Sequence, residues 1–497
     1  MSRLFFIYVA LLPALLVSGS KQFRLGRGKG GNLGLPVKDV GDPLPRARWF
    51  QQKLDHASPT DLRTWKQRYY VNDSFYDANN PGPVFLMVGG EGPADAKWMV
   101  KGAWVEYAEK FKALCIMVEH RYYGESRPTK DISTKNLQYL SSSQALADIA
   151  NFINAMNAKY SLDTTKVKWV AFGGSYPGSL VAWLRIKYPH LVHAAISSSG
   201  PLLAKLNFME YYEVVADAIQ EKTASSECVN RIKDAHEQII TLMITNPEQL
   251  DQEFRTCKPL KEASEDDKKN FFNSIADDFA ELVQYNEDNR ISQDKKMKNF
   301  TINTICDMLV GEQNESNIYI QVGKFNSIIL DMSNQTCLDY SYDNMIQELR
   351  NMSYSATEGG RQWMYQTCTE FGFYQTSTAE VELFGDEFPL EFFIKQCEDI
   401  FGDKFDEKFI ANSVAWTNNE YGGLGITASR VMYVHGSIDP WHALGITSTM
   451  HIDAPAIYVK GTAHCADMYP SRDEDLPELV RARIAIQNQL ADWLQLP

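Results

Sequence analysis

Short apolar runs of strand length alternate with stretches of helical periodicity up to about residue 204. After the serines at 141–143, which offer N-caps, Leu146, Ile149 and Phe152 recur at helical spacing. Strands that alternate with helices indicate a parallel sheet with helices on both faces. The expected strands are 67–71, 84–88, 114–118, 167–172 and 194–197, and a further helix is expected at 179–188.

From about 205 to 410 this alternation stops, over a stretch far longer than an ordinary connecting loop. Apolar residues such as Phe271, Ile275 and Phe279 recur there at helical spacing, and glycine is sparse. Strand-like runs return at 430–434 and 456–460, and a closing helix is expected at 477–494. The pattern predicts an α/β domain, 49–204 and 411–497, interrupted by a helical insertion at 205–410.

The N-terminal stretch at 1–20 is typical of a secretory signal. Arg3 precedes an apolar run at 4–17, and small residues follow at 18–20. That run is too short to span a bilayer comfortably, and no later stretch approaches about 18 uninterrupted apolar residues. Glycines are frequent at 21–48, which predicts a flexible or removable leader. We expect a soluble, exported mature protein.

Cysteine usage agrees with an exported protein. Six of the eight cysteines fall between residues 228 and 397 without C-x-x-C pairs, so disulfides are a better interpretation than zinc, and their pairing stays open. The formal net charge of −14 argues against binding to nucleic acid, which needs a basic surface. The candidate glycosylation sites are the sequons at Asn72, Asn299, Asn314, Asn334 and Asn351.

One short stretch carries the candidate nucleophile. The expected strand at 167–172 runs into Gly173-Gly174-Ser175, and the helical pattern resumes at once. A sharp strand-to-helix turn between small residues is what a nucleophile elbow requires, and it would present Ser175 beside a helix N-terminus. The usual motif has glycine where this chain has Pro177, with Gly178 one residue later. An ordinary turn is the alternative interpretation.

A serine hydroxyl is a weak nucleophile, so it needs a base and an acid that orients the base. In α/β-hydrolases these partners follow in the order serine, acid, histidine, in loops after late strands. Here the strand at 430–434 leads to Asp439, and the strand at 456–460 leads to His464. Ser175, Asp439 and His464 are therefore the candidate triad, and the other histidines are expected to be packed or solvated residues.

The oxyanion of an acyl-transfer intermediate needs N–H donors. The backbone N–H of Tyr176, at the start of a helix, is one candidate, and Gly90 in an early glycine-rich loop is the other. For that loop an ordinary glycine turn is the alternative. Trp441, Ser179 and Glu91 are candidate substrate contacts, although core packing explains Trp441 equally well.

Metal chemistry has little support. The sequence has no H-E-x-x-H motif and no Cys/His cluster with ligand spacing, so we expect no metal and no cofactor. Glu119, His120 and Arg121 follow the strand at 114–118, and we expect them to form a buried ion network rather than to act in catalysis.

Several longer motifs resemble the S28 family of serine peptidases, and they cover nearly all of the mature chain. Gly178 is normal in that family, and GGSYPGSL at 173–180 with GTAHCADM at 461–468 is most similar to its thymus-specific branch. The motifs are WFQQKLDH at 49–56, QRYYVN at 67–72, EHRYYGES at 119–126, GGSYPG at 173–178, GSIDPW at 436–441 and the segment around His464.

The resemblance implies an α/β-hydrolase fold with Ser175, Asp439 and His464 as nucleophile, orienting acid and base, and the helical insertion as a cap over the active site. It implies exopeptidase action on short peptides. Prolyl-specific members carry a methionine four residues after the nucleophile, where this chain has Ser179, so post-proline cleavage follows from the family but not from this position. The implied disulfides are Cys228 to Cys306, Cys257 to Cys337 and Cys368 to Cys397.

Two other functions stay open. An esterase or lipase would use the same triad, and a non-catalytic binding protein would share the fold, although such relatives commonly lack a triad residue. The sequence is compatible with carboxypeptidase or dipeptidyl peptidase action, with a secreted or a lysosomal protein, and with a homodimer.

Overall fold

The computed structural model describes residues 34–36, 41, 43–287, 300–311, 317–355, 359–381 and 383–495. In this part of the chain, eight strands form one sheet in the order β1-β2-β4-β3-β5-β6-β9-β10. β2 pairs antiparallel with β1 and with β4, and every other neighbouring pair is parallel. The α/β-hydrolase fold expected from the sequence is thereby confirmed. The strands are β1 (Arg48–Lys53), β2 (Thr64–Asn72), β3 (Val84–Val88), β4 (Leu114–Val118), β5 (Trp169–Gly174), β6 (Ala194–Ser198), β9 (Val431–Gly436) and β10 (Ala456–Val459).

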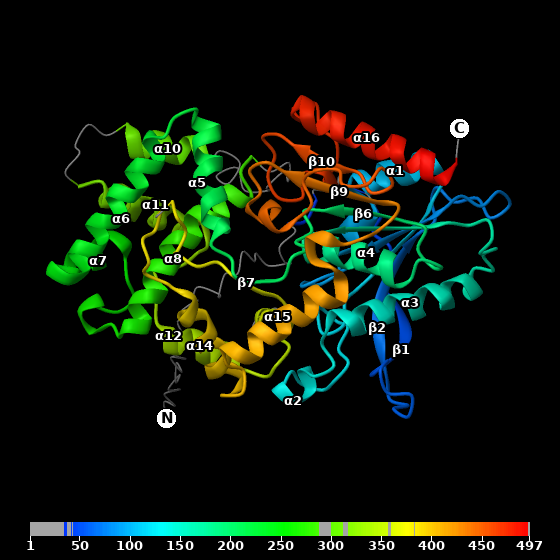
Figure 1. The fold of residues 1–497 in the computed structure, drawn as a ribbon, viewed down its shortest axis with the longest axis horizontal. Helices are drawn as coiled ribbons and strands as arrows, with labels where there is room; N and C mark the ends of the chain where they lie inside the picture. The colour runs from blue at the N-terminus through cyan, green and yellow to red at the C-terminus, as the bar shows by residue number, and fades with distance from the viewer. Residues whose placement is uncertain are drawn as a thin grey trace, which may run out of the picture.

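The central strands are apolar throughout because both faces of the sheet are covered. In β4, Leu114 and Ile116 lie in one hydrophobic cluster, whereas Cys115 and Met117 lie in a second cluster on the opposite face. Helices α3 and α4 cover the first face, and α1 and α16 cover the second (Figure 1). The helices of this domain are α1 (Ala103–Phe111), α2 (Thr134–Leu137), α3 (Ser142–Lys159), α4 (Tyr176–Lys187) and α16 (Pro477–Leu494).

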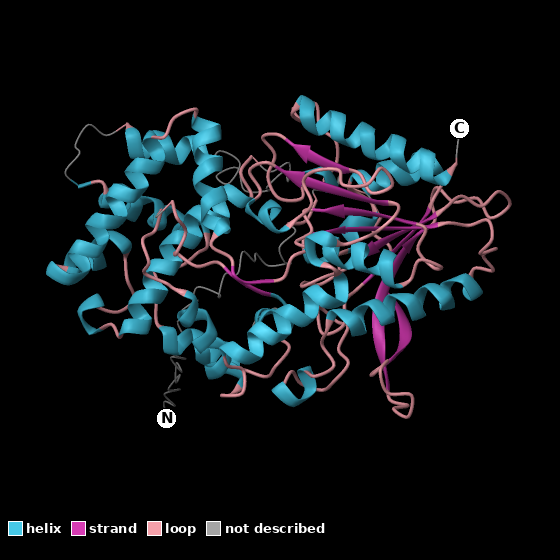
Figure 2. Cartoon of the chain, in the orientation of Figure 1, coloured by secondary structure: helices cyan, strands magenta, loops and turns pink. Residues whose placement is uncertain are grey.

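Between β6 and β9 the chain leaves the sheet and forms a mostly helical region, although Ala195 of β6 pairs directly with Val431 of β9. Figure 2 shows these helices beyond the tips of the strand arrows. We call the elements from β7 to α15 the cap; the predicted boundary at 410 falls inside α15. They are β7 (Lys205–Asn207), α5 (Glu210–Thr223), α6 (Glu227–Thr245), α7 (Pro247–Phe254), α8 (Glu265–Gln284), α10 (Ile302–Val310), α11 (Tyr319–Met332), α12 (Tyr342–Arg350), α13 (Gly360–Gln366), β8 (Gly372–Tyr374), α14 (Leu390–Phe401) and α15 (Glu407–Tyr421).

Three disulfides connect segments of the cap, and they are the pairs that the family resemblance implies. The first connects α6 to α10, and the third connects a π-helix, Thr367–Phe371, to α14. Such bonds form in the oxidising secretory pathway. The disulfides are Cys228–Cys306, Cys257–Cys337 and Cys368–Cys397, while Cys115 and Cys465 are buried free thiols.

Helix α4 and strand β1 differ from the sequence-based expectation. Helix α4 begins at Tyr176 rather than at 179, because β5 turns within the single residue Ser175 and Pro177 suits the first turn of a helix. Strand β1 is not predicted by the apolar pattern, because most of its residues are exposed at the edge of the sheet.

The N-terminal segment is described only in part. The predicted signal at 1–20 lies outside the described residues. From the predicted leader, the hydroxyl of Tyr469 donates to the carbonyl of Gly34 at 2.9 Å, and Leu35 packs on the second hydrophobic cluster. Among the described residues, no helix is long and apolar enough to cross a lipid bilayer.

A buried carboxylate lies at the joint between the cap and the sheet domain. Glu370, in the π-helix, accepts hydrogen bonds from the backbone N–H of Ser142 at 2.9 Å and from the amide of Gln366 at 3.2 Å. Gln366 also donates to the hydroxyl of Tyr176, at 3.1 Å. Burial outweighs these donors and raises the pKa of Glu370 to about 7.

Glu370 should make the stability of the wild type depend on pH. Since its pKa is about 7 when folded and near 4.5 in an exposed chain, the folded state binds more protons between these values, and the free energy of unfolding falls as pH rises through this window. Glu370→Gln removes this pH-dependent part of the free energy of unfolding, which amounts to about 3 kcal/mol. Urea denaturation of both proteins at pH 4.5, 5.5 and 7.5 measures it, and equal pH slopes would contradict the assignment.

Candidate active site

The candidate nucleophile lies on a strained turn. β5 ends at Gly174, α4 begins at Tyr176, and Ser175 between them has φ 65° and ψ −134°, which is unusual for a residue with a side chain. A Cβ at Gly173 would lie 2.2 Å from the carbonyl oxygen of Pro177, and one at Gly178 would lie 2.6 Å from that of Ser198. The turn therefore requires these glycines, including the displaced Gly178.

Asp439 and His464 meet beyond the ends of β9 and β10. Nδ1 of His464 lies 2.9 Å from Oδ1 of Asp439, and neither side chain has exposed surface. The backbone N–H of Trp441 donates to the same oxygen at 3.1 Å. Because Asp439 accepts at Nδ1, the neutral imidazole carries its proton there and leaves Nε2 as the basic atom.

Burial and charge act in opposite directions on this pair. Burial opposes a charge on His464, but the carboxylate of Asp439 outweighs it and raises the pKa of His464 well above its ordinary value. Burial likewise opposes ionisation of Asp439, but His464 outweighs it and the pKa of Asp439 is lowered. Both pKa shifts favour the state in which His464 is protonated and Asp439 is ionised.

The loop that carries His464 packs against the turn at Ser175. The backbone N–H of Ser175 and the thiol of Cys465 both donate to the carbonyl of Ser198, at 2.9 and 3.7 Å. A Cβ at Gly174 would lie 2.1 Å from Sδ of Met468. Nε2 of His464 has no hydrogen-bond partner among the described residues, so Ser175 and His464 are not hydrogen-bonded in this structure; catalytic hydrogen bonds are often long before substrate binds.

The two residues that carry the candidate oxyanion donors both lie close to the turn at Ser175. Tyr176 is the first residue of α4, so its backbone N–H has no acceptor within the helix. Gly90 lies against the ring of Pro177, since a Cβ at Gly90 would come within 2.3 Å of its Cγ. Both residues therefore border the turn at Ser175.

Residues 119–121 divide between two roles. Glu119 pairs with Arg68, and Arg121 pairs with Asp148 at 2.7 Å, so the predicted buried ion network exists for these two. Nε2 of His120 instead lies 3.1 Å from the hydroxyl of Tyr176. Burial lowers the pKa of His120 to about 4, so it is neutral and supports the residue that follows the candidate nucleophile.

The candidate substrate contacts differ in their surroundings. Ser179 is 1% exposed and its hydroxyl donates to the carbonyl of Pro201 at 2.8 Å. Glu91 is buried near the cap, where its carbonyl oxygen lies 3.4 Å from a Cβ built at Gly359. Trp441 is 7% exposed and joins an aromatic cluster.

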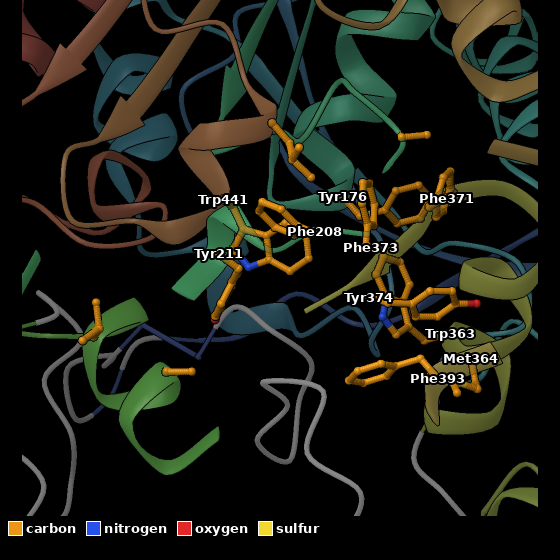
Figure 3. Packing of buried hydrophobic residues seen from close by; sticks show 14 of the residues in the cluster. Tyr176, Phe208, Tyr211, Trp363, Met364, Phe371, Phe373, Tyr374, Phe393 and Trp441 are labelled. Atoms are coloured by element: carbon orange, nitrogen blue, oxygen red, sulfur yellow. The ribbon is translucent and has the colours of Figure 1, made fainter. Parts of the chain in front are cut away.

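This aromatic cluster connects the loop of Asp439 with the turn at Ser175 (Figure 3). Trp441 meets Phe373 at a ring-centroid distance of 5.4 Å, Phe373 stacks on Phe371 at 5.4 Å, and Phe371 meets Tyr176 at 5.3 Å. Phe208 also contacts Trp441, at 5.5 Å. The sheet domain supplies Trp441 and Tyr176, and the cap supplies the phenylalanines.

Sequence reasoning missed the cap residues of this cluster. Phe371 and Phe373 lie on a distorted segment, where a π-helix is followed by Gly372 with φ 67° and Phe373 with φ 64°. Irregular backbone of this kind often marks a functional site. The density of aromatic residues at 371–374 was the available signal.

The predicted glycosylation sites differ in their surroundings. Asn334 and Asn351 are exposed, whereas Nδ2 of Asn72 donates to the carbonyl of Met99 at 2.8 Å. Asn299 and Asn314 lie outside the described residues. Within the described ranges, no group of three or more His, Cys, Asp or Glu residues has the arrangement of a metal site.

Comparisons with known proteins show which family the chain belongs to. The model of the family "Serine carboxypeptidase S28" matches residues 52–486. Thymus-specific serine protease of Mus musculus is 34% identical over 461 residues, covering 91% of this chain and 88% of the relative. Lysosomal Pro-X carboxypeptidase of Homo sapiens is 27% identical over 505 residues, covering 98% and 94%. Among solved structures, proline iminopeptidase of Mycobacterium smegmatis covers 90% of this chain and 99% of its own, with 11% identity and a TM-score of 0.40. The chain belongs to the serine carboxypeptidase S28 family, as its motifs indicate.

Proposed function

We propose that the protein is a serine-type exopeptidase that hydrolyses short peptides through an acyl-enzyme on Ser175. The observation that carries this proposal is the fully buried pair of His464 and Asp439, 2.9 Å apart, beside the strained turn that holds Ser175. Membership of the S28 family supports peptide bonds as the substrate.

His464 acts in both halves of the proposed reaction, the acylation of Ser175 and the hydrolysis of the acyl-enzyme. Nε2 of His464 takes the proton of the Ser175 hydroxyl while the oxygen attacks the peptide carbonyl, and Asp439 stabilises the imidazolium through Nδ1. The backbone N–H groups of Tyr176 and Gly90 donate to the oxyanion. His464 then protonates the leaving amine, and water, activated by His464, hydrolyses the acyl-enzyme.

We further propose an apolar residue, proline included, at the cleavage site. The rings of Trp441 and Phe373 are 7% and 6% exposed and lie beside the loop of Asp439. The hydroxyl of Ser179 donates to the carbonyl of Pro201 and is not free to bind a polar substrate group. One relative is named a Pro-X carboxypeptidase. Lysosomal or secreted location and a homodimer stay predictions.

A fluorophosphonate probe tests the nucleophile. It should label the wild type on Ser175, and labelling should disappear in Ser175→Ala, because the probe reacts only with an activated serine. Labelling is read by fluorescence in a gel and by mass mapping. Ser179→Ala, on the same helix, is the matched control and should still be labelled. A mature wild type that is never labelled would contradict the enzyme assignment.

Peptide specificity needs a separate comparison. The wild type should cleave a series of short peptides with a higher kcat/KM than simple esters or lipids, measured under the same conditions. Efficient turnover of esters without any peptide cleavage would favour an esterase instead.

The raised pKa of His464 predicts a pH dependence. His464 accepts a proton only when it is neutral, so kcat/KM should be low in acid and rise through a midpoint above 6.5. In Asp439→Asn the negative charge is lost, so the midpoint should move to lower pH while the plateau falls by about 10⁴-fold. Rates of peptide cleavage from pH 4 to 9 measure both, and an unmoved midpoint would contradict the assignment of His464.

The aromatic cluster predicts a selective loss. Phe373→Leu keeps bulk but removes the ring against Trp441, so kcat/KM for peptides with an apolar residue at the cleavage site should fall about tenfold, and less for small polar residues. Phe405→Leu is the matched control, since Phe405 contacts Phe401 and Phe409 inside the cap. Equal losses for both peptide classes would argue against a substrate contact.

A further inference from the structure

Gln284 is the last residue of α8 and reaches out of the cap to both loops of the candidate triad. It is 2% exposed. Its side-chain oxygen Oε1 accepts from Nε1 of Trp441 at 2.9 Å and from the hydroxyl of Tyr211 at 2.6 Å. Its backbone carbonyl accepts from the backbone N–H of His464 at 3.0 Å. One cap residue thus contacts the loop of the acid and the loop of the base.

We propose that Gln284 is a positioning residue that couples the cap to the pair of His464 and Asp439. The inference rests on the serine-peptidase chemistry proposed above. It assigns to the cap a role in holding the base and the acid, in addition to covering the site.

The backbone contact fixes the direction of the chain at His464. A buried N–H must find an acceptor, and the acceptor for His464 comes from the cap. The next N–H, of Cys465, donates to the hydroxyl of Ser199 in the sheet domain at 2.9 Å. Cys465 has φ 56°, so the chain turns sharply here. Successive N–H groups are therefore held from the two sides of the joint.

The side-chain contact fixes the loop of Asp439. An indole N–H can only donate, so the atom that Trp441 meets must be the amide oxygen of Gln284. The backbone N–H of the same Trp441 donates to Oδ1 of Asp439 at 3.1 Å. Gln284 therefore acts on the carboxylate through a single intervening residue.

The cap surroundings hold Gln284 in turn. Tyr211 belongs to α5 and its ring lies edge-on to Trp441, at a centroid distance of 5.8 Å. The ring of Tyr285, directly after Gln284, lies edge-on to the imidazole of His464 at 6.2 Å. Two cap helices thus meet the triad loops at one amide, and displacement of the cap would release both loops together.

Gln284→Met tests the coupling, because methionine has a similar length and its thioether is only a weak acceptor for Trp441. We expect kcat for a short peptide to fall about tenfold or more with KM within about twofold, and the rate of fluorophosphonate labelling to fall by the same factor, since small misplacement of catalytic groups is costly. Gln284→Glu keeps an acceptor oxygen at the same reach and should recover most of the loss.

Asn270→Leu is the matched control. Asn270 is also a buried amide on α8, but it donates to the carbonyl of Tyr340 inside the cap, at 2.9 Å. This variant should lose stability in urea denaturation while kcat stays within about twofold of the wild type. Equal losses of kcat in both variants would show general loosening of the cap and overturn the proposal.

A variant that does not fold, a failure of the coupling and a failure of the proposed function give different results. Should Gln284→Met fail to fold, Tyr211→Phe removes one of the two donors to the amide and should lower kcat about threefold; an unchanged kcat overturns the coupling. A labelled wild type with an equally labelled Gln284→Met also overturns it and leaves the proposed function intact. An unlabelled wild type overturns the proposed function instead.

Discussion

The hydrogen bond between Nδ1 of His464 and Oδ1 of Asp439 joins two side chains that have no exposed surface. Burying two charged groups costs desolvation free energy, which their attraction offsets only where the geometry is good and further hydrogen bonds satisfy the remaining atoms. The surroundings of this pair must therefore be well defined. The backbone N–H of Trp441 supplies one such donor. The pair therefore depends on two loops whose positions are fixed by the parallel strands β9 and β10 beneath them.

The sheet and the cap contribute different parts of the site. The sheet brings Ser175, Asp439 and His464 to the same edge, because β5, β9 and β10 are parallel and end there. The cap provides the phenylalanines near Trp441 and the acceptors of Gln284. Glu370 and Gln366 form a second joint, which reaches Tyr176 on the nucleophile side. The cap thus contacts the loops of Asp439 and His464 on one side and Tyr176, the residue after Ser175, on the other.

Much of this arrangement is local in the sequence and could be predicted. Clear patterns mark the glycines around Ser175, the strands at 84–88 and 114–118 and the final helix. Ser175, Asp439 and His464 could be selected because each follows a predicted strand. The strand before Ser175 extends two residues further than expected, since Gly173 and Gly174 can continue it.

The contacts between the cap and the site could not be predicted in the same way. Gln284 is one amide at the end of an amphipathic helix, and no local pattern tells that it meets His464 far along the chain. Phe373 adopts φ 64°, a conformation that its sequence does not favour and that the packing of the joint imposes. Tertiary contacts decide these positions, so only the density of aromatic residues at 371–374 was visible beforehand.

Peptide hydrolysis through an ester on Ser175 leaves a covalent intermediate that can be trapped. The most direct measurement is to quench the wild type in acid during turnover of a short peptide p-nitrophenyl ester and to map the protein by mass spectrometry. The account predicts the acyl mass on the segment that contains Ser175, and its disappearance on the time scale of turnover. Two results would contradict it. One is an acyl group on another residue. The other is a burst of p-nitrophenol at saturating substrate with no acylated protein.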